Sequence, residues 1–421
     1  MSTPQMIKWA KDLFPICRSI TGEGIRKTLS YFEKINPELK RIKYKTNQNV
    51  FDWVIPKEWN IKDAFIEHES GEKFAEFKKC NLHVVGYSTP VNKTISKNEL
   101  LNHIYTQKDQ PDSIPYVTSY YKERWGFCLS ENQKEKLPDG NYRVFIDSNL
   151  KNGSLELSHA VLKGKNKKEI FFQSYVCHPS MANNELSGPV LLNAIMQYIK
   201  SKYPRRKYSY RFVLHPETIG SIAYLSKFLK ILKTNVVCGF NLTMVGDERA
   251  YSHVSSRTGD TLADQALKAA LLGLPNVKNY SFLDRGSDER QYGSPGVDLP
   301  FCSFSRSKKY PEYHTNKDNF DTVTQEGLMG SFEVIKKIID AFELGLYPTT
   351  KLPCEPNLGK RGLYPTISQK GEQYAESQIR KDLLAYSDGK TNIFKIATIF
   401  NKPLDKLCDE YKILNSKKLL K

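Results

Sequence analysis

The sequence predicts an α/β protein built on a mostly parallel sheet flanked by helices. From residue 142 onward, short apolar runs of strand length alternate with longer runs that have apolar residues at helical spacing. Such alternation favours a parallel sheet with helices packed against it. In addition, residues with catalytic chemistry follow several of these strand-like runs, at the edge where open α/β sheets bind their ligands.

The elements can be followed in order along the chain. Residues 4–38 carry apolar side chains at helical spacing and predict two helices separated by residues 18–22. Residues 42–139 are rich in aromatic residues, short alternating runs and turn residues, which indicates a small inserted β-rich domain. The strand-like runs after it are 143–147, 170–176, 210–214 and 236–243, and the helix-like runs are 191–200, 221–230, 261–272 and 327–345.

The C-terminal part differs from the rest. Residues 348–365 are punctuated by Pro and Gly and predict a linker. Residues 376–421 predict three short helices of a winged-helix-like domain. We therefore expect residues 1–41 and 140–347 to form the α/β domain, 42–139 the inserted domain, and 348–421 the linker and winged-helix-like domain.

Composition restricts the class of protein. No apolar run reaches the ~20 residues that span a bilayer, and the N-terminus lacks a signal-peptide pattern, so we expect a cytoplasmic protein without membrane contact. The eight cysteines are scattered, which does not favour a disulfide framework or a cysteine-based zinc module. The net charge of +17 raises a nucleic-acid hypothesis, but the basic residues are spread along the chain.

One stretch carries most of the chemical information. His178 follows the strand-like run 170–176, and a polar loop then leads through Asn184 and Glu185 into a helix that begins with Ser187-Gly188. Three later segments extend the pattern: His215-Pro216-Glu217-Thr218-Ile219-Gly220, Asn241-Leu242-Thr243-Met244-Val245-Gly246-Asp247 and Tyr313-His314-Thr315-Asn316-Lys317-Asp318.

In this order, the segments resemble the di-zinc aminopeptidase fold. The likeness is greater to a group of bacterial aminopeptidase-like proteins linked to polysaccharide-biosynthesis gene clusters, and it covers essentially the whole chain. The phrases specific to that group are Phe14-Pro15-Ile16-Cys17-Arg18-Ser19-Ile20-Thr21-Gly22, Tyr87-Ser88-Thr89-Pro90-Val91-Asn92, Pro115-Tyr116-Val117-Thr118-Ser119-Tyr120-Tyr121 and Gly286-Ser287-Asp288-Glu289-Arg290-Gln291. The resemblance implies a zinc-exopeptidase-like sheet with an inserted domain and a C-terminal winged-helix-like domain.

The resemblance also implies roles for individual residues. His178 and His314 match the two metal-binding histidines, and Asn184 matches the aspartate that bridges two zinc ions. Glu217 matches the general base, with Thr218 in place of the second-metal ligand. A shift by one residue would instead make Glu217 the ligand and leave Pro216 in place of the base.

Other positions follow from the same match. Ser180 replaces an aspartate that orients the first histidine, and Thr243 replaces the first-metal aspartate. Asp288 and Arg290 are expected to border the substrate cleft, and Tyr313 is a further candidate for substrate binding, as are Tyr310 and Arg257.

The number of carboxylates limits the metal site. Two zinc ions would need three carboxylate ligands, but Glu217 is the only one in the matched positions, with Glu185 or Asp247 as untested substitutes. We therefore expect a single zinc ion held by His178, His314 and either Asn184 or Glu217. Each residue also has a structural interpretation, since a histidine after a strand often bonds nearby backbone and a glutamate can stabilise a helix N-terminus.

Three functional hypotheses result. The first is a metal-dependent, aminopeptidase-like hydrolase acting on a small amide, an aminoacyl or N-acyl group on a peptide or glycan. The second is a catalytically degenerate peptidase fold kept as a binding or scaffold protein. The third is a nucleic-acid-binding regulator, which we favour least. Assembly into a homo-oligomer stays open.

Overall fold

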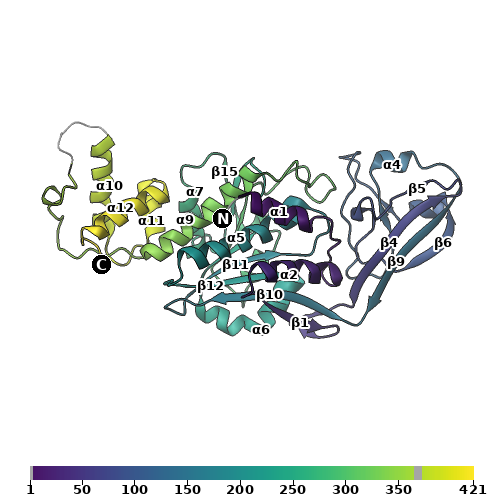
Figure 1. The fold of residues 1–421 in the computed structure, drawn as a ribbon, viewed down its shortest axis with the longest axis horizontal. Helices are drawn as coiled ribbons and strands as arrows, with labels where there is room; N and C mark the ends of the chain where they lie inside the picture. The colour runs from purple at the N-terminus through teal and green to yellow at the C-terminus, as the bar shows by residue number, and fades with distance from the viewer. Residues whose placement is uncertain (1–2, 365–371) are drawn as a thin grey trace.

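The computed structural model describes residues 3–364 and 372–421 and has an elongated shape (Figure 1). A large sheet with its helices occupies the middle of the molecule. A second sheet lies at one end, and the C-terminal helices lie at the other. The described part of the chain contains no helix long and apolar enough to cross a membrane.

The central sheet has eight strands in the order β1-β10-β12-β11-β13-β16-β14-β15. Its middle strands β12, β11, β13 and β16 are parallel, while β1 and β10 on one side and the β14–β16 pair on the other are antiparallel. The strands are β1 (Lys40–Lys45), β10 (Ser154–Leu162), β11 (Glu169–Tyr175), β12 (Ser209–His215), β13 (Val236–Leu242), β14 (Tyr251–Val254), β15 (Val277–Tyr280) and β16 (Phe301–Ser305). The expected α/β fold with helices flanking a sheet is confirmed.

Helices cover both faces of this sheet because its strands are apolar on both sides. In β11, Phe172 belongs to the cluster shared with α1, α2, α5, α7 and α9, and its neighbour Phe171 packs on the opposite face with α6 and α8. The helices are α1 (Thr3–Leu13), α2 (Glu23–Ile35), α5 (Ser187–Lys202), α6 (Ile219–Asn235), α7 (Leu262–Leu271), α8 (Glu289–Tyr292) and α9 (Gln325–Gly345).

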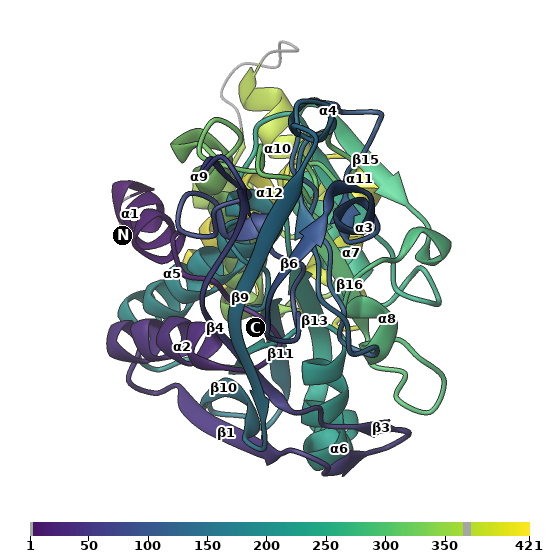
Figure 2. The same ribbon diagram turned by 90° about the vertical axis from the view of Figure 1, so that its right-hand side faces the viewer.

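The second sheet is antiparallel, with the order β5-β4-β9-β6, and it faces the viewer in Figure 2. Its strands are β4 (Glu58–His68), β5 (Lys73–Phe74), β6 (Val91–Ser96) and β9 (Asn141–Lys151), and shorter elements of this part are α3 (Lys97–Leu101), β7 (Ile104–Tyr105), β8 (Phe127–Cys128) and α4 (Glu131–Glu135). The short pair β2 (Asn49–Val50) and β3 (Trp53–Val54) lies instead beside α6 of the central sheet.

Placing residues 143–147 in the parallel sheet was wrong. They lie within β9, which pairs along its length with β4. The apolar side chains Tyr142, Val144 and Ile146 alternate along β9 and fill the separate core of the second sheet. Period-two alternation gives a strand but not its partner, and only the pairing with β4 decides the sheet to which it belongs.

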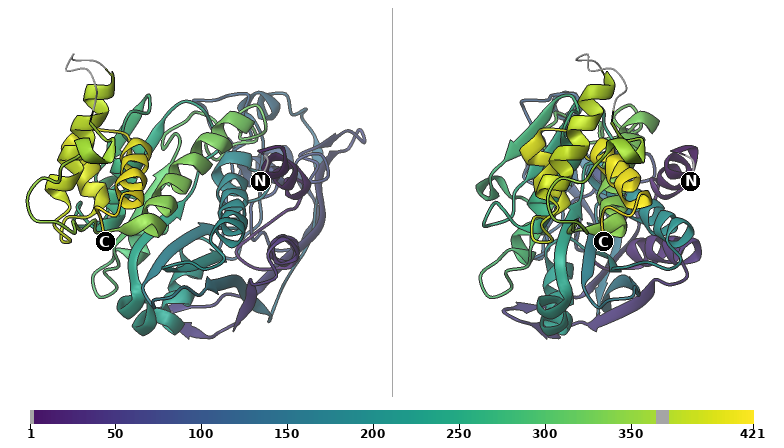
Figure 3. Two further views of the ribbon diagram at one scale, coloured as in Figure 1. Left: turned by 60° about the vertical axis from the view of Figure 1, so that its left-hand side comes forward. Right: turned by 90° about the vertical axis from the view of Figure 1, so that its left-hand side faces the viewer.

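The chain ends in α10 (Glu372–Tyr386), α11 (Ile393–Phe400) and α12 (Leu404–Ser416), at the end of the molecule shown in Figure 3. The three predicted helices are therefore present. Phe394 of α11 packs on Phe342 of α9, with ring centroids 5.1 Å apart, and the apolar faces of α11 and α12 continue the core of the central sheet. Pro365, the last residue of the predicted linker, lies outside the described residues.

Candidate metal and catalytic site

The candidate residues gather at the carboxyl ends of neighbouring strands. His178 follows β11, Glu217 follows β12 and Thr243 follows β13. Because β11 pairs in parallel with both β12 and β13, these three strand ends lie side by side. His314 comes from the loop after β16. The parallel register thus brings together residues far apart in the sequence.

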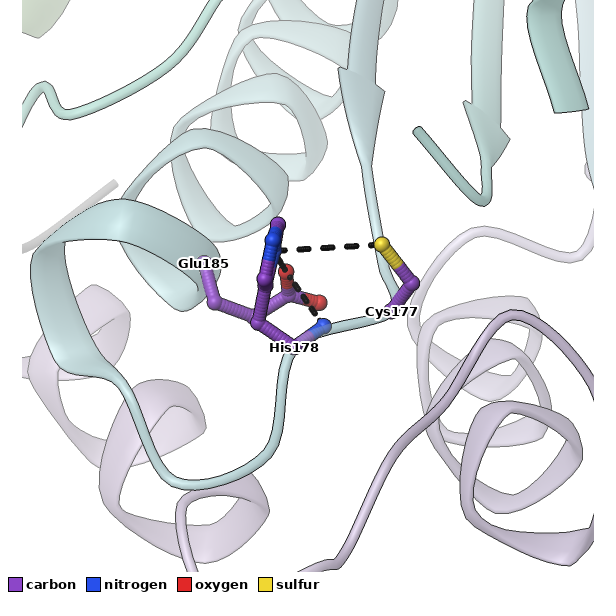
Figure 4. Close-up of side chains that lie close together, drawn as sticks. All are labelled: Cys177, His178 and Glu185. Atoms are coloured by element: carbon purple, nitrogen blue, oxygen red, sulfur yellow. Dashed lines mark hydrogen bonds and ion pairs between the residues drawn. The ribbon is translucent and has the colours of Figure 1, made fainter. Parts of the chain in front are cut away.

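His178 is held in one orientation by Glu185 (Figure 4). Oε2 of Glu185 lies 3.0 Å from Nδ1 of the ring and also accepts the backbone N–H of His178 at 3.0 Å. Nε of Arg18 lies 3.5 Å from Oε1 of Glu185 and donates to the carbonyl oxygen of His178 at 2.9 Å. The pair with Glu185 places the ring proton on Nδ1 and leaves the lone pair on Nε2 for a ligand.

The resemblance placed the residue that orients His178 at position 180, which is Ser180 in this chain. In the structure, Glu185 orients the ring instead. Ser180 Oγ donates instead to the carbonyl oxygen of Phe14 at 2.8 Å and accepts from Nδ2 of Asn81 at 2.7 Å. Glu185 can reach His178 because residues 182–186 form a π-helical turn, a wider turn that often occurs at functional sites.

Two tight groups of three metal-binding residue types occur in the described parts of the chain: Cys177–His178–Glu185 and His253–Asp264–Cys302. In the first, Nδ1 of His178 is already paired with Glu185. In the second, Asp264 accepts from Ser256, Thr261 and His253 and caps α7. Both groups therefore have a complete structural explanation.

His178 and His314 lie next to each other, with ring centroids 5.3 Å apart. Tyr116, from the segment before β9, packs edge-on against both rings, at 5.1 Å and 5.3 Å. Its backbone N–H donates to the carbonyl oxygen of His314 at 2.8 Å. Within the described residues, Nε2 of His314 is buried and has no hydrogen-bond partner.

Both imidazoles are neutral at physiological pH. Burial, with Arg18 acting in the same direction, lowers the pKa of His178 to about 3. Burial and the neighbouring His178 lower the pKa of His314 to about 3. Neutral imidazole is the form that binds a metal ion. A buried, unpartnered Nε2 beside a second oriented imidazole is therefore a feature that a metal would satisfy.

Glu217 faces this histidine pair from a strained turn. Thr218 has φ 63° and ψ −78°, and the N–H of Ile219 donates to the carbonyl oxygen of Glu217 at 2.8 Å, which together form a γ-turn. Oε1 of Glu217 accepts from Ser287 Oγ at 2.7 Å, and Oε2 lies 3.8 Å from Nε2 of His178. Desolvation and the nearby Asp288 carboxylate raise the pKa of Glu217 to about 8.

The three expected substrate-binding residues have different positions. Asp288 is fully buried next to the turn at Thr218. It accepts from the N–H of Thr218 at 2.9 Å and from Ser221 Oγ at 2.7 Å. Arg290 donates to the hydroxyl of Thr218. Tyr313 is exposed and stacks on His314 with ring centroids 3.8 Å apart. Asp288 and Arg290 thus hold the turn of Glu217, whereas Tyr313 lines a cavity.

Asn184 belongs to a neutral hydrogen-bonded chain. Its Nδ2 donates to the hydroxyl of Tyr175 at 2.9 Å, and that hydroxyl lies 2.6 Å from Thr243 Oγ1. Oδ1 of Asn184 is buried without a partner in the described chain. Asp318 accepts the backbone N–H of Asn184 at 2.8 Å. No carboxylate stands at these positions, so the residues do not fit a di-zinc centre.

Asp247 is occupied by other contacts. It accepts from Ser307 Oγ at 2.6 Å, from the N–H of Ser307 and of Arg249, and from Nδ2 of Asn183. Because its carboxylate is 1% exposed and already accepts four hydrogen bonds, it is not available as a substitute ligand.

Two cavities meet at Glu217. One of about 210 Å³ is lined by His178, His314, Glu217 and Tyr116, among others. The second, of about 340 Å³, is lined by Glu217, Asn184, Thr243 and Tyr313, among others. His178, His314 and Glu217 thus line the smaller cavity together, while Asn184 lines the larger one. A metal ion with two imidazole nitrogens and one oxygen ligand fits this donor set.

Backbone strain is concentrated in the same loops. Ser180, Thr218, Met244 and His314 are non-glycine residues with φ of 33°, 63°, 51° and 57°. Left-handed conformations at such residues cost free energy and occur often at functional sites. The strain here accompanies the turns that present Glu217 and His314.

Tyr116 and Ser287 contact the candidate site but were not among the residues expected there from the sequence. Tyr116 lies in a segment whose residue pattern predicted only β structure. Its approach to His314 depends on a long-range β-bridge between Pro115 and Thr315. Ser287 was visible only as a neighbour of Asp288. Neither residue has a spacing that points to chemistry.

Comparisons with known proteins agree with this fold. The family model described as "Domain of unknown function (DUF4910)" matches residues 7–345, and a winged helix-turn-helix model matches residues 346–421. A Clostridium acetobutylicum protein, named provisionally as a polysaccharide biosynthesis protein with an aminopeptidase-like domain, is 41% identical over 390 residues, which are 92% of this chain and 89% of that protein.

Solved structures give the same result. A crystal structure from Clostridium acetobutylicum, named provisionally as a peptidase, has a TM-score of 0.91 and 38% identity, and the match covers 100% of this chain and 96% of the other. A zinc aminopeptidase from Bacillus subtilis has a TM-score of 0.59 with 14% identity, over 80% of this chain and 93% of the other. At 14% identity, the second match concerns the fold alone.

Proposed function

Because this chain belongs to the DUF4910 family and has an aminopeptidase-like fold, we propose that it is a metal-dependent hydrolase of a small amide. The observation that carries the proposal is the pair of neutral imidazoles, His178 and His314, with ring centroids 5.3 Å apart beside Glu217. The name of the Clostridium relative supports a substrate met in polysaccharide or glycan biosynthesis, carrying an aminoacyl or N-acyl group.

His178 and His314 would hold a single zinc ion through their Nε2 atoms. Glu217 or Asn184 would supply the third ligand: Oε2 of Glu217 lies 3.8 Å from Nε2 of His178, and Oδ1 of Asn184 is buried without a partner among the described residues. When bound, zinc supplies an acidified water and polarises a carbonyl group. Glu185 keeps His178 in the tautomer that ligates, and Tyr116 covers both rings against bulk water.

Glu217 would transfer protons during hydrolysis. Ser287 fixes one carboxylate oxygen, which leaves Oε2 directed at His178 and the cavity. Desolvation and Asp288 raise its pKa toward neutrality, so the side chain can take up a proton and return it to a leaving amine. The variant Glu217→Gln distinguishes a role as base from a role as metal ligand.

Metal analysis tests the proposal. The purified protein should hold about one zinc ion per chain, and His178→Ala and His314→Ala should each lose it. His159→Ala is the matched control, because His159 lies on β10 and stacks against Phe228 of α6. Hydrolysis of aminoacyl and N-acyl amides by the zinc-loaded protein should disappear in both site variants. Equal zinc content in all four proteins would contradict the proposal.

A second candidate function is a peptidase fold retained for binding without catalysis. The neutral chain Asn184–Tyr175–Thr243 supports it, since charged ligands are absent there. Asn184→Asp separates the two functions. A large gain in zinc affinity without hydrolysis of any amide would favour the binding protein, and a wild-type hydrolysis that requires Glu217 would exclude it.

A further inference from the structure

The cavity of about 340 Å³ beside Glu217 has walls rich in hydroxyl groups. Its only aliphatic side chains are Met244 and Val254. The residues with hydroxyls are Tyr175, Thr243, Ser287, Ser303, Ser305, Tyr310 and Tyr313. The oxygens of these hydroxyls can accept hydrogen bonds from a polar group of a ligand.

Two lysines line the same cavity. Lys308 is partly buried and Lys309 is exposed, and neither forms an ion pair with any residue that the structure describes. Nζ of Lys308 lies 3.8 Å from the point that a Cβ on Gly286 would occupy. The ammonium group is therefore next to the Gly286-Ser287 backbone, whose serine hydroxyl donates to Glu217.

The acidic residues of this cavity do not neutralise the lysines. Glu289 is buried and accepts from Asn241 Nδ2 at 2.9 Å and from the backbone N–H groups of Gly286 at 2.8 Å and Ser287 at 3.2 Å. Glu217 is engaged by Ser287 on one oxygen and faces His178 with the other. The two ammonium groups are thus cations that line this cavity without an ion-pair partner among the described residues.

The geometry points to a substrate that carries an anionic group, a carboxylate or a phosphate, on the part that fills this cavity. Lys308 and Lys309 would bind that group as specificity-determining residues, and the amide would lie at Glu217. This inference rests on the proposed function for the position of the amide. Unlike the proposed function alone, it predicts that a ligand with a positive charge in this cavity binds poorly.

Binding to matched probes tests the assignment. The probes are N-acetylglycine against N-acetylglycinamide, and N-acetylglucosamine 6-phosphate against N-acetylglucosamine, titrated calorimetrically into the full-length protein. The anionic member of at least one pair should bind about tenfold or more tightly, because a charge-assisted contact is replaced by a neutral one. A preference confined to one pair identifies the anion as carboxylate or phosphate.

Variants connect the preference with the lysines. Lys308→Gln with Lys309→Gln should abolish it, whereas Lys317→Gln, an exposed lysine outside the cavity walls, should retain it. Unchanged melting temperatures verify folding. Equal or undetectable affinities within both pairs, or a preference that survives in the double variant, would overturn the inference. Charge-selective binding without hydrolysis would refute only the proposed function.

Discussion

Glu185 Oε2 and His178 Nδ1 lie 3.0 Å apart in an interior where both side chains are almost completely buried. The contact fixes the ring and directs Nε2 toward the cavity shared with His314 and Glu217. Burial raises the pKa of Glu185 to about 8, and Arg18 opposes this shift. The histidine is thus prepared for a ligand by residues that do not touch that ligand.

We expect Glu185→Gln to weaken zinc binding by about 10- to 100-fold, as is typical when the partner of a metal-bound histidine is changed. Glutamine keeps the volume, but its amide N–H₂ replaces one of the two oxygens that can accept from Nδ1 and the backbone N–H of His178. Competition with a chromogenic chelator gives the affinity. Glu312→Gln, which breaks a surface pair with Arg249, is the control. An unaltered affinity in Glu185→Gln would show that the contact does not prepare a metal ligand.

Glu217→Gln separates the two roles of this residue. If Glu217 is the base, the variant retains zinc and loses about 100-fold or more of the amide hydrolysis rate, because proton transfer contributes a factor of this size. If Glu217 is a ligand, zinc content falls together with activity. Steady-state hydrolysis and metal content measured on the same preparation distinguish these outcomes. Full activity in the variant would exclude both roles.

The sequence predicted the candidate site from residues that follow strands. His178, Glu217 and Thr243 could be placed together because parallel strands bring their carboxyl ends to one edge. The supporting contacts could not be predicted in this way. Asp288 holds Thr218 from below, and Tyr116 crosses from another part of the chain, so both depend on tertiary packing.

For the fold too, local features could be predicted from the sequence and long-range contacts could not. Local patterns predicted the longer helices and three of the eight strands of the central sheet, β11, β12 and β13, since apolar periodicity is a local property. They did not predict the partners of β9, because pairing with β4 is a long-range event. The boundaries of the inserted domain, 42 and 139, stay a prediction.

A partly buried ion pair connects α2 with the second sheet and should make stability depend on pH. Arg26 donates to both oxygens of Glu58, at 2.8 Å and 2.6 Å, and these hydrogen bonds lower the pKa of Glu58 to about 2. Because the folded pKa lies below the unfolded value, this stabilisation is complete above about pH 4.5 and is lost as the pH falls toward 2.

The corresponding variant is Glu58→Gln. At pH 7 it should lower the free energy of unfolding by ~1–3 kcal/mol, and the difference from wild type should shrink below pH 4.5. Urea unfolding at pH 7, 5 and 4 provides the comparison. Asp139→Asn, which alters an exposed pair with Lys97, should have little effect at any pH. A difference that stays constant with pH would contradict the assigned ionisation.

The C-terminal helices are expected not to bind DNA. Asn392, at the start of α11, donates to Gln265 of α7 at 2.8 Å, and Asp405 of α12 pairs with Lys337 of α9 at 3.0 Å. On α12, Lys412 is paired with Asp409 at 2.7 Å. Fluorescence anisotropy of the full-length protein with duplex DNA should show no binding at low salt. Tight binding that weakens steeply with salt would contradict this expectation.

Anomalous diffraction at the zinc edge, from crystals of the zinc-loaded protein, tests the central claim most directly. We predict one strong peak in the cavity between β11 and the loop after β16, with Nε2 of His178 and Nε2 of His314 both at about 2.0–2.1 Å from it. A peak at His253, Asp264 and Cys302 instead, or no peak while both imidazoles remain in place, would contradict the account.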